Sequence, residues 1–108
     1  MALVHAQPLE IIDLHKADDS SGATVSRSLL RSPRLQLLRV VLEAGDLLPK
    51  HHVSGDVTIQ CLYGDADVVT ASRTCQLVAG SLMMLPAEMP HEVSARVHTA
   101  LLITIVQR

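Results

Sequence analysis

Hydrophobic residues along this chain gather in short runs of four to eight residues that are rich in Val, Leu, Ile and Thr. Turn-forming residues such as Gly45, Gly64 and Gly80 separate the runs, and helix signals are weak throughout. Many short strands joined by turns are typical of an all-β sandwich or barrel. The pattern therefore predicts strands over residues 25–30, 35–42, 57–63, 66–71, 74–78, 82–85, 91–95 and 99–106.

Residues 35–42 are apolar at both odd and even positions, with Leu37 and Val41 on one face and Leu38 and Val40 on the other. A strand with one face in water alternates between apolar and polar residues instead. The second apolar face needs a cover, and a partner subunit is the simplest one, so we expect a homodimer. Residues 1–34 are expected to form a strand and loop segment that packs on the barrel or on that partner, with the barrel itself in residues 35–108.

The composition suits one globular domain and excludes several classes of partner. The chain has 108 residues, of which 48% are hydrophobic, enough for a core in a single domain. Nine Lys and Arg against eleven Asp and Glu leave no basic surplus for a nucleic acid. With one Tyr and no Phe or Trp, the chain lacks the stacking platform that nucleotides and flavins use, so neither cofactor is expected.

The two cysteines, Cys61 and Cys75, lie in apolar runs without C-x-x-C spacing. Buried thiols explain them better than a disulfide, because the first fourteen residues carry no secretory signal. The apolar run at residues 99–106 is too short to span a bilayer. The expected location is therefore the cytoplasm, with no membrane partner.

Two segments carry the candidate chemistry, at residues 45–64 and 80–95. Within them the chain resembles the cupin superfamily, whose motifs are G-x5-H-x-H-x3-4-E-x6-G and G-x5-P-x-G-x2-H-x3-N. The matching anchors are Gly45, His51, Gly64, Gly80, Pro86 and His91. The resemblance covers residues 35–106 and implies a cupin-like jelly-roll β-barrel in which His51 and His91 face one pocket.

Cupins that hold a metal use two His and a Glu from the first motif and one His from the second. Here Val53 and Val57 stand at the second His and the Glu, and Glu88 stands at the glycine of the second motif. Only His51 and His91 keep a ligand type. Two imidazoles alone hold a divalent ion such as Zn, Ni, Fe or Mn weakly, so a bound metal and a metal-free pocket both stay open.

Other side chains can extend this pocket. His52 can replace a missing ligand, although strict strand alternation turns it away from His51 unless a bulge re-aims it. Cys61 shares the inward parity of Val57 and can supply a sulfur, although packed core explains it as well. Arg39 and Lys50 are cations that an anionic ligand can meet, while surface or interface ion pairs explain them equally. His5 and His98 fit no pattern and are interpreted as surface residues.

Two functional hypotheses follow. The first is a binding or sensing protein for a small molecule, with Val53, Val57 and Cys61 lining a mostly apolar pocket and His51, His91 and His52 as polar anchors or metal ligands. The alternative is a metal-dependent enzyme that acts on a small molecule, for which the resemblance implies dioxygenase-like or isomerase-like chemistry. The sequence does not decide whether the protein is an enzyme, and a fold hosts many functions.

Overall fold

The computed structural model describes residues 5–14 and 25–107, apart from the side chains of Val25 and His51. These residues form strands and no helix, so they contain none that could cross a membrane, and the all-β prediction is confirmed. The strands are β1 (Val25–Arg31), β2 (Leu35–Leu42), β3 (Leu47–His51), β4 (Asp56–Tyr63), β5 (Asp65–Val69), β6 (Thr74–Val78), β7 (Leu82–Leu85), β8 (His91–Ala95) and β9 (Thr99–Val106).

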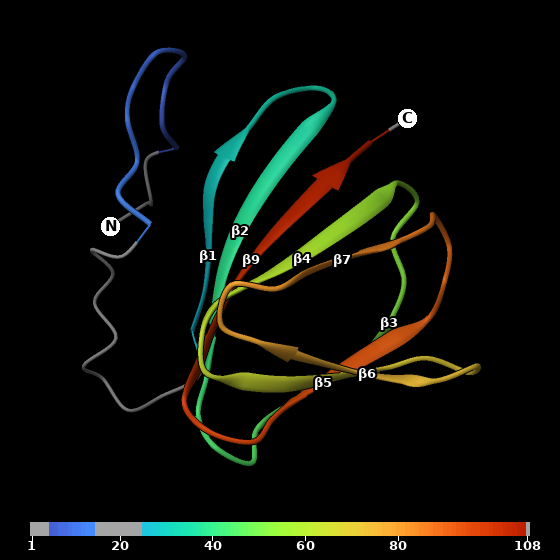
Figure 1. Ribbon diagram of the computed structural model, residues 1–108. Coiled ribbons are helices and arrows are strands. Elements are labelled where there is room, and N and C mark those ends of the chain that lie inside the picture. The colour runs from blue at the N-terminus through green and yellow to red at the C-terminus, as the bar shows by residue number, and fades with distance from the viewer. Residues whose placement is uncertain (1–4, 15–24, 108) are drawn as a thin grey trace.

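The strands form two antiparallel sheets that face each other (Figure 1). The five-stranded sheet has the order β1-β2-β9-β4-β7, and the four-stranded sheet has the order β3-β8-β5-β6. The chain passes repeatedly from one sheet to the other, so strands that are distant in the sequence become neighbours. This double-sheet arrangement is that of a jelly roll.

The core lies between the two sheets, because alternate residues of each strand point inward. On β4 these are Val57, Ile59 and Cys61, and on β8 Val93 and Ala95, all of them buried. The remaining core side chains are aliphatic as well, and Met83 and Met89 pack against their edge. A core of aliphatic side chains and one cysteine, without aromatic rings, agrees with a composition that has almost no aromatic residues.

The outer face of the five-stranded sheet is also covered in part. Arg39, Val41, Ala100 and Leu102 lie on this face and are buried within the single chain. The Nε atom of Arg39 donates a hydrogen bond of 2.9 Å to the carbonyl oxygen of Leu14. The N-terminal segment of the same chain therefore reaches this face, and the homodimer expected from the two-faced strand stays a prediction.

The eight predicted strands agree with the observed ones within two residues at each end, but β3 was missed. This strand lies at the edge of its sheet and contains Pro49, which cannot donate to a strand ladder. Its register with β8 is interrupted between Leu48 and His51. An edge strand with a proline and an irregularity shows no alternating pattern, which explains the omission.

Candidate functional site

His91, the first residue of β8, is the best defined member of the predicted pocket. It is only 3% exposed and occupies the same inward parity as Val93 and Ala95. Its Nδ1 atom lies 3.1 Å from the carbonyl oxygen of Met89. Because a carbonyl only accepts, Nδ1 carries the proton, and Nε2 of the neutral ring is the acceptor nitrogen. Histidines that ligate metals through Nε2 are oriented in this way.

A β-bulge in β3 determines which residue lies opposite His91. Leu48 pairs with Val93, and His51 pairs with His91, so three steps along β3 match two steps along β8. Without the extra residue, Lys50 would take the place opposite His91. The backbone register therefore brings positions 51 and 91 together. The side chain of His51 lies outside the described residues, so its orientation stays a prediction.

His52 lies at the surface beside Glu88. Its side chain is 58% exposed, and Nε2 is 3.8 Å from Oε2 of Glu88. An exposed pair of this kind contributes little to stability. The backbone nitrogen of Glu88 donates a 2.8 Å hydrogen bond to the carbonyl oxygen of Val53, which fixes the turn before β8. Glu88 has φ of 70°, so it stands in the left-handed region that the motif glycine adopts without strain.

The three other predicted pocket residues lie in or against the core. Val57 and Cys61 are buried in β4, and Val53 packs against the core cluster while remaining half-buried. The Sγ atom of Cys61 donates to the carbonyl oxygen of Tyr63 at 3.3 Å. Burial, and to a lesser extent the charge of Asp65, raises the pKa of the Cys61 thiol. Since metals bind the thiolate, this thiol is poorly suited to be a ligand.

The described side chains do not fit a complete transition-metal site. They contain no group of three or more His, Cys, Asp or Glu residues placed to hold a metal ion, although the side chain of His51 is not among them. Protein sites for zinc use three or four protein ligands. A divalent ion at His91 and His51 would have to take most of its shell from water or from a bound molecule.

A hollow of about 230 Å³ opens at the end of the four-stranded sheet, next to His91 in sequence. It is lined by Lys50, the turn at residues 70–72, Met89 and Pro90. The carbonyl of Met89 is the one that orients His91, so the wall of the hollow and the histidine are directly connected. Of the two cations considered from the sequence, Lys50 lines this hollow, whereas Arg39 is buried against the N-terminal segment.

A second polar cluster, which the sequence did not reveal, lies beyond the other end of β8. His98 bridges Oε2 of Glu43 through Nδ1 at 2.7 Å and the hydroxyl of Tyr63 through Nε2 at 3.1 Å. The rings of Tyr63 and His98 are stacked with centroids 5.5 Å apart. A carboxylate only accepts, so Nδ1 donates to Glu43. This cluster ties together the chain after β2, the end of β4 and the turn before β9.

No protein-family model and no curated protein matches this sequence. Solved structures resemble it in fold. A conserved protein of unknown function from Streptococcus pyogenes is 21% identical, with a TM-score of 0.83 over 100% of this chain and 98% of that one. A cupin superfamily protein from Desulfitobacterium hafniense DCB-2 is 18% identical, with a TM-score of 0.83 over 96% and 95% of the two chains. KdgF from a Halomonas species is 16% identical, with a TM-score of 0.73 over 84% of each chain. Likeness at these identities establishes the fold alone.

Proposed function

This chain has the cupin fold, and we propose that it binds a small molecule through His51 and His91 at one end of its barrel. The observation that carries the proposal is the buried, oriented imidazole of His91 with position 51 directly opposite it. Residues opposite one another in an antiparallel pair have Cβ atoms about 4.5–5.5 Å apart. Two imidazoles at that spacing can meet the same ligand or the same ion.

The surroundings favour a ligand with an apolar body and an acidic group. Val57 lies in the apolar core, Val53 and Met89 pack against it, and Met89 also lines the hollow. Lys50 lines the neighbouring hollow and is a cation that a carboxylate or phosphate can meet there. In this proposal Cys61 is a packed core residue behind the pocket and does not bind the ligand. His52 is a surface residue that a ligand at the rim of the pocket can reach.

Any divalent metal in this pocket is held weakly, since Val53 and Val57 occupy the two positions where the family has further ligands. A bound Zn, Ni, Fe or Mn ion would be completed by water or by the small molecule. The alternative function, a metal-dependent enzyme for a small molecule, is favoured by one observation, the hydrogen bond between Nδ1 of His91 and the Met89 carbonyl, which is the ring orientation of histidines that bind a metal through Nε2. Metal analysis of purified, untagged protein separates the two, because stoichiometric metal supports the enzyme.

The pocket is tested by restoring the ligands that the family uses. The double change Val53→His and Val57→Glu is expected to raise the affinity for nickel or zinc by orders of magnitude. Without metal the variant loses stability, by about 1–3 kcal/mol per site, because polar groups replace apolar ones near the core. Added metal restores the melting temperature, since it binds the folded state only. Titration calorimetry and thermal unfolding with the metal alone measure both effects.

Two further substitutions in the double variant serve as controls. His91→Ala is expected to abolish the rescue by metal, because His91 is the ligand from the other motif. His52→Ala is expected to leave the rescue unchanged, because His52 is exposed beside Glu88. A folded double variant that gains nothing from metal would show that positions 51, 53, 57 and 91 do not converge, and the pocket proposal would fail with it.

A further inference from the structure

The cluster of Glu43, Tyr63 and His98 joins three separate parts of the chain in a fixed arrangement. Glu43 follows β2, Tyr63 ends β4, and His98 lies in the turn before β9. The connections after β2 and before β9 lie side by side at the bottom of Figure 1. A Cβ atom on Gly64 would lie only 2.6 Å from the carbonyl oxygen of His98, so the chain next to Tyr63 touches the backbone of His98. Packed backbone therefore holds the two rings together, in addition to their own hydrogen bond.

The hydrogen bonds of this cluster give each side chain a distinct chemical role. Nδ1 of His98 donates to Oε2 of Glu43 at 2.7 Å, so the neutral ring has its lone pair on Nε2. The phenol of Tyr63 lies 3.1 Å from that nitrogen and donates to it. A nucleophile next to a base that a third group orients is the arrangement that activates a hydroxyl group for attack on an acyl carbon. When the phenol proton moves to Nε2, the carboxylate of Glu43 stabilises the imidazolium that forms.

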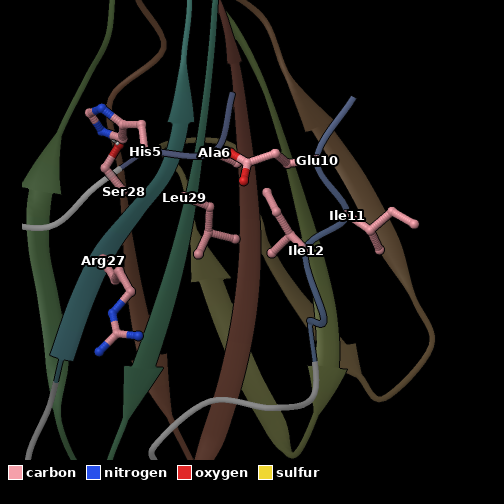
Figure 2. A pocket seen from close by; sticks show the side chains of 8 residues that line it. All are labelled: His5, Ala6, Glu10, Ile11, Ile12, Arg27, Ser28 and Leu29. Carbon is pink, nitrogen blue, oxygen red and sulfur yellow. Dashed lines mark hydrogen bonds between the residues drawn. The ribbon is translucent and has the colours of Figure 1, made fainter. Parts of the chain in front are cut away.

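A second contact between a histidine and a hydroxyl group shows what the cluster adds. Nε2 of His5 lies 2.9 Å from Oγ of Ser28, beside the hollow between the N-terminal segment and β1 (Figure 2). Oγ of Ser28 also accepts a hydrogen bond from Nε2 of Gln36 at 3.2 Å. Among the residues that the structure describes, no carboxylate bonds to the ring of His5. Ser28 therefore has a base beside it without the carboxylate that orients such a base, and its aliphatic hydroxyl is less acidic than a phenol.

The charges around the cluster favour a neutral acyl donor. Glu43 is part of the cluster, and a second carboxylate, Asp65, stands at the start of β5. The guanidinium of Arg96 pairs with another aspartate of β5 at 3.0 Å. Phosphoryl donors are anionic, so these carboxylates repel them. Val97, which precedes His98 in the chain, is 47% exposed and offers apolar surface to a small acyl group.

We propose that Tyr63 is a site of covalent acylation by neutral esters of small apolar carboxylic acids, with His98 as its general base and Glu43 as the residue that positions His98. The phenolic oxygen forms a bond to the acyl carbon, and the bond between that carbon and the leaving oxygen breaks. The phenol proton passes to Nε2 of His98 and from there to the leaving oxygen, which departs as an alcohol or a phenol. The product is an O-acyl tyrosine, and its formation does not depend on the pocket at His91.

The first test compares the folded chain with the unfolded chain, because Tyr63 is the one tyrosine of the sequence. The probe is p-nitrophenyl acetate, and peptide mass spectrometry measures the rate of acetylation at Tyr63 with and without urea. A general base contributes about 10²–10⁴-fold, and partial burial of the phenol slows access, so the folded chain is expected to react about tenfold faster or more. Burial and hydrogen bonding without activation protect a tyrosine, so a folded chain that reacts no faster would overturn the proposal. Ser28 is expected to stay unmodified, and acetylation of Ser28 to the same extent would also overturn it.

Amide substitutions then separate the roles of the two partners. His98→Gln removes the base and is expected to lower the rate about tenfold or more. Glu43→Gln keeps an acceptor for Nδ1 but removes the charge, and it is also expected to lower the rate. The advantage of the wild type over His98→Gln is expected to shrink as the pH rises towards the ordinary phenol pKa of about 10, because phenolate needs no base. A merely structural role of His98 would not give this pH dependence.

Matched controls make the same changes on the N-terminal segment. His5→Gln and Glu10→Gln, at two residues that line the hollow in Figure 2, are expected to leave the rate at Tyr63 unchanged. Equal rates for the wild type and either His98→Gln or Glu43→Gln would overturn the proposal, as would an advantage of the wild type that stays constant with pH.

Discussion

Replacing Gly64 by alanine is expected to destabilise the barrel much more than the same replacement at Gly45 or Gly80. The three glycines share a positive φ, at 96°, 85° and 86° respectively. An alanine at any of them therefore meets the same backbone strain, about 1–2 kcal/mol. The three positions differ in what the added Cβ atom would touch, so the comparison isolates that contact.

A Cβ atom on Gly64 would lie 2.4 Å from Oγ1 of Thr99 and 2.6 Å from the carbonyl oxygen of His98. At Gly45 and Gly80 it would meet nothing within 4 Å. The Thr99 hydroxyl cannot simply move away, because it accepts from the backbone nitrogen of Asp65 at 3.0 Å and lies 2.8 Å from the Val97 carbonyl oxygen. Forcing these groups apart adds about 1–3 kcal/mol to the backbone strain.

Urea denaturation of the three alanine variants measures these differences directly. We expect a loss of about 2–5 kcal/mol at Gly64 and about 1–2 kcal/mol at the other two positions. In thermal unfolding each kcal/mol corresponds to about 4–8 °C for a domain near this size. If the Gly64 variant matched the other two within about 0.5 kcal/mol, which is the usual effect of a neutral surface change, the reasoning from the close contact would be refuted.

Three shorter predictions concern buried and linked side chains. In the folded chain iodoacetamide should modify the half-buried Cys75 before the buried Cys61. In the unfolded chain the two cysteines should react at equal rates, and mass spectrometry can follow both reactions. Because burial raises the pKa of Cys61, the unfolded chain loses this proton first, so stability should fall as the pH rises above the ordinary thiol pKa, and Cys61→Ala should flatten that fall. A double-mutant cycle of Tyr63→Phe and His98→Phe should give a coupling of about 1 kcal/mol, and additive losses would show that their hydrogen bond contributes nothing.

The strands could be predicted because most of them carry their own signal. Residues 56–63 alternate between buried and partly exposed positions, and residues 99–106 form an apolar run bounded by turns. β3 could not be predicted because its pairing depends on a neighbour. It lies at the sheet edge, where Pro49 is tolerated. Its backbone pairing with β8 defines it as a strand, because its own sequence shows no alternating pattern.

Part of the candidate site also carries its own signal in the sequence, and part depends on contacts between strands. The motif spacing selected His91, and the structure places it inward at the start of β8. The bulge between Leu48 and His51 is a property of the pairing, so strand alternation alone could not say which of Lys50 and His51 lies opposite His91, and only the motif resemblance selected His51. The contact between Glu43 and His98 joins residues far apart in the chain, with no spacing rule that would reveal it.

The motif residues in this chain separate into two groups with different physical roles. The three glycines are required by the backbone conformation. Gly45, Gly64 and Gly80 all have a positive φ, and at Gly64 the neighbouring chain also leaves no room for a Cβ atom. Neither requirement involves a metal. Val57, which the motif resemblance aligns with a metal ligand of cupins, is buried in the core. A carboxylate there would have to be kept out of water or be paired with a metal. Val57 therefore adds apolar packing to the core at a position where a carboxylate would need a metal or another partner.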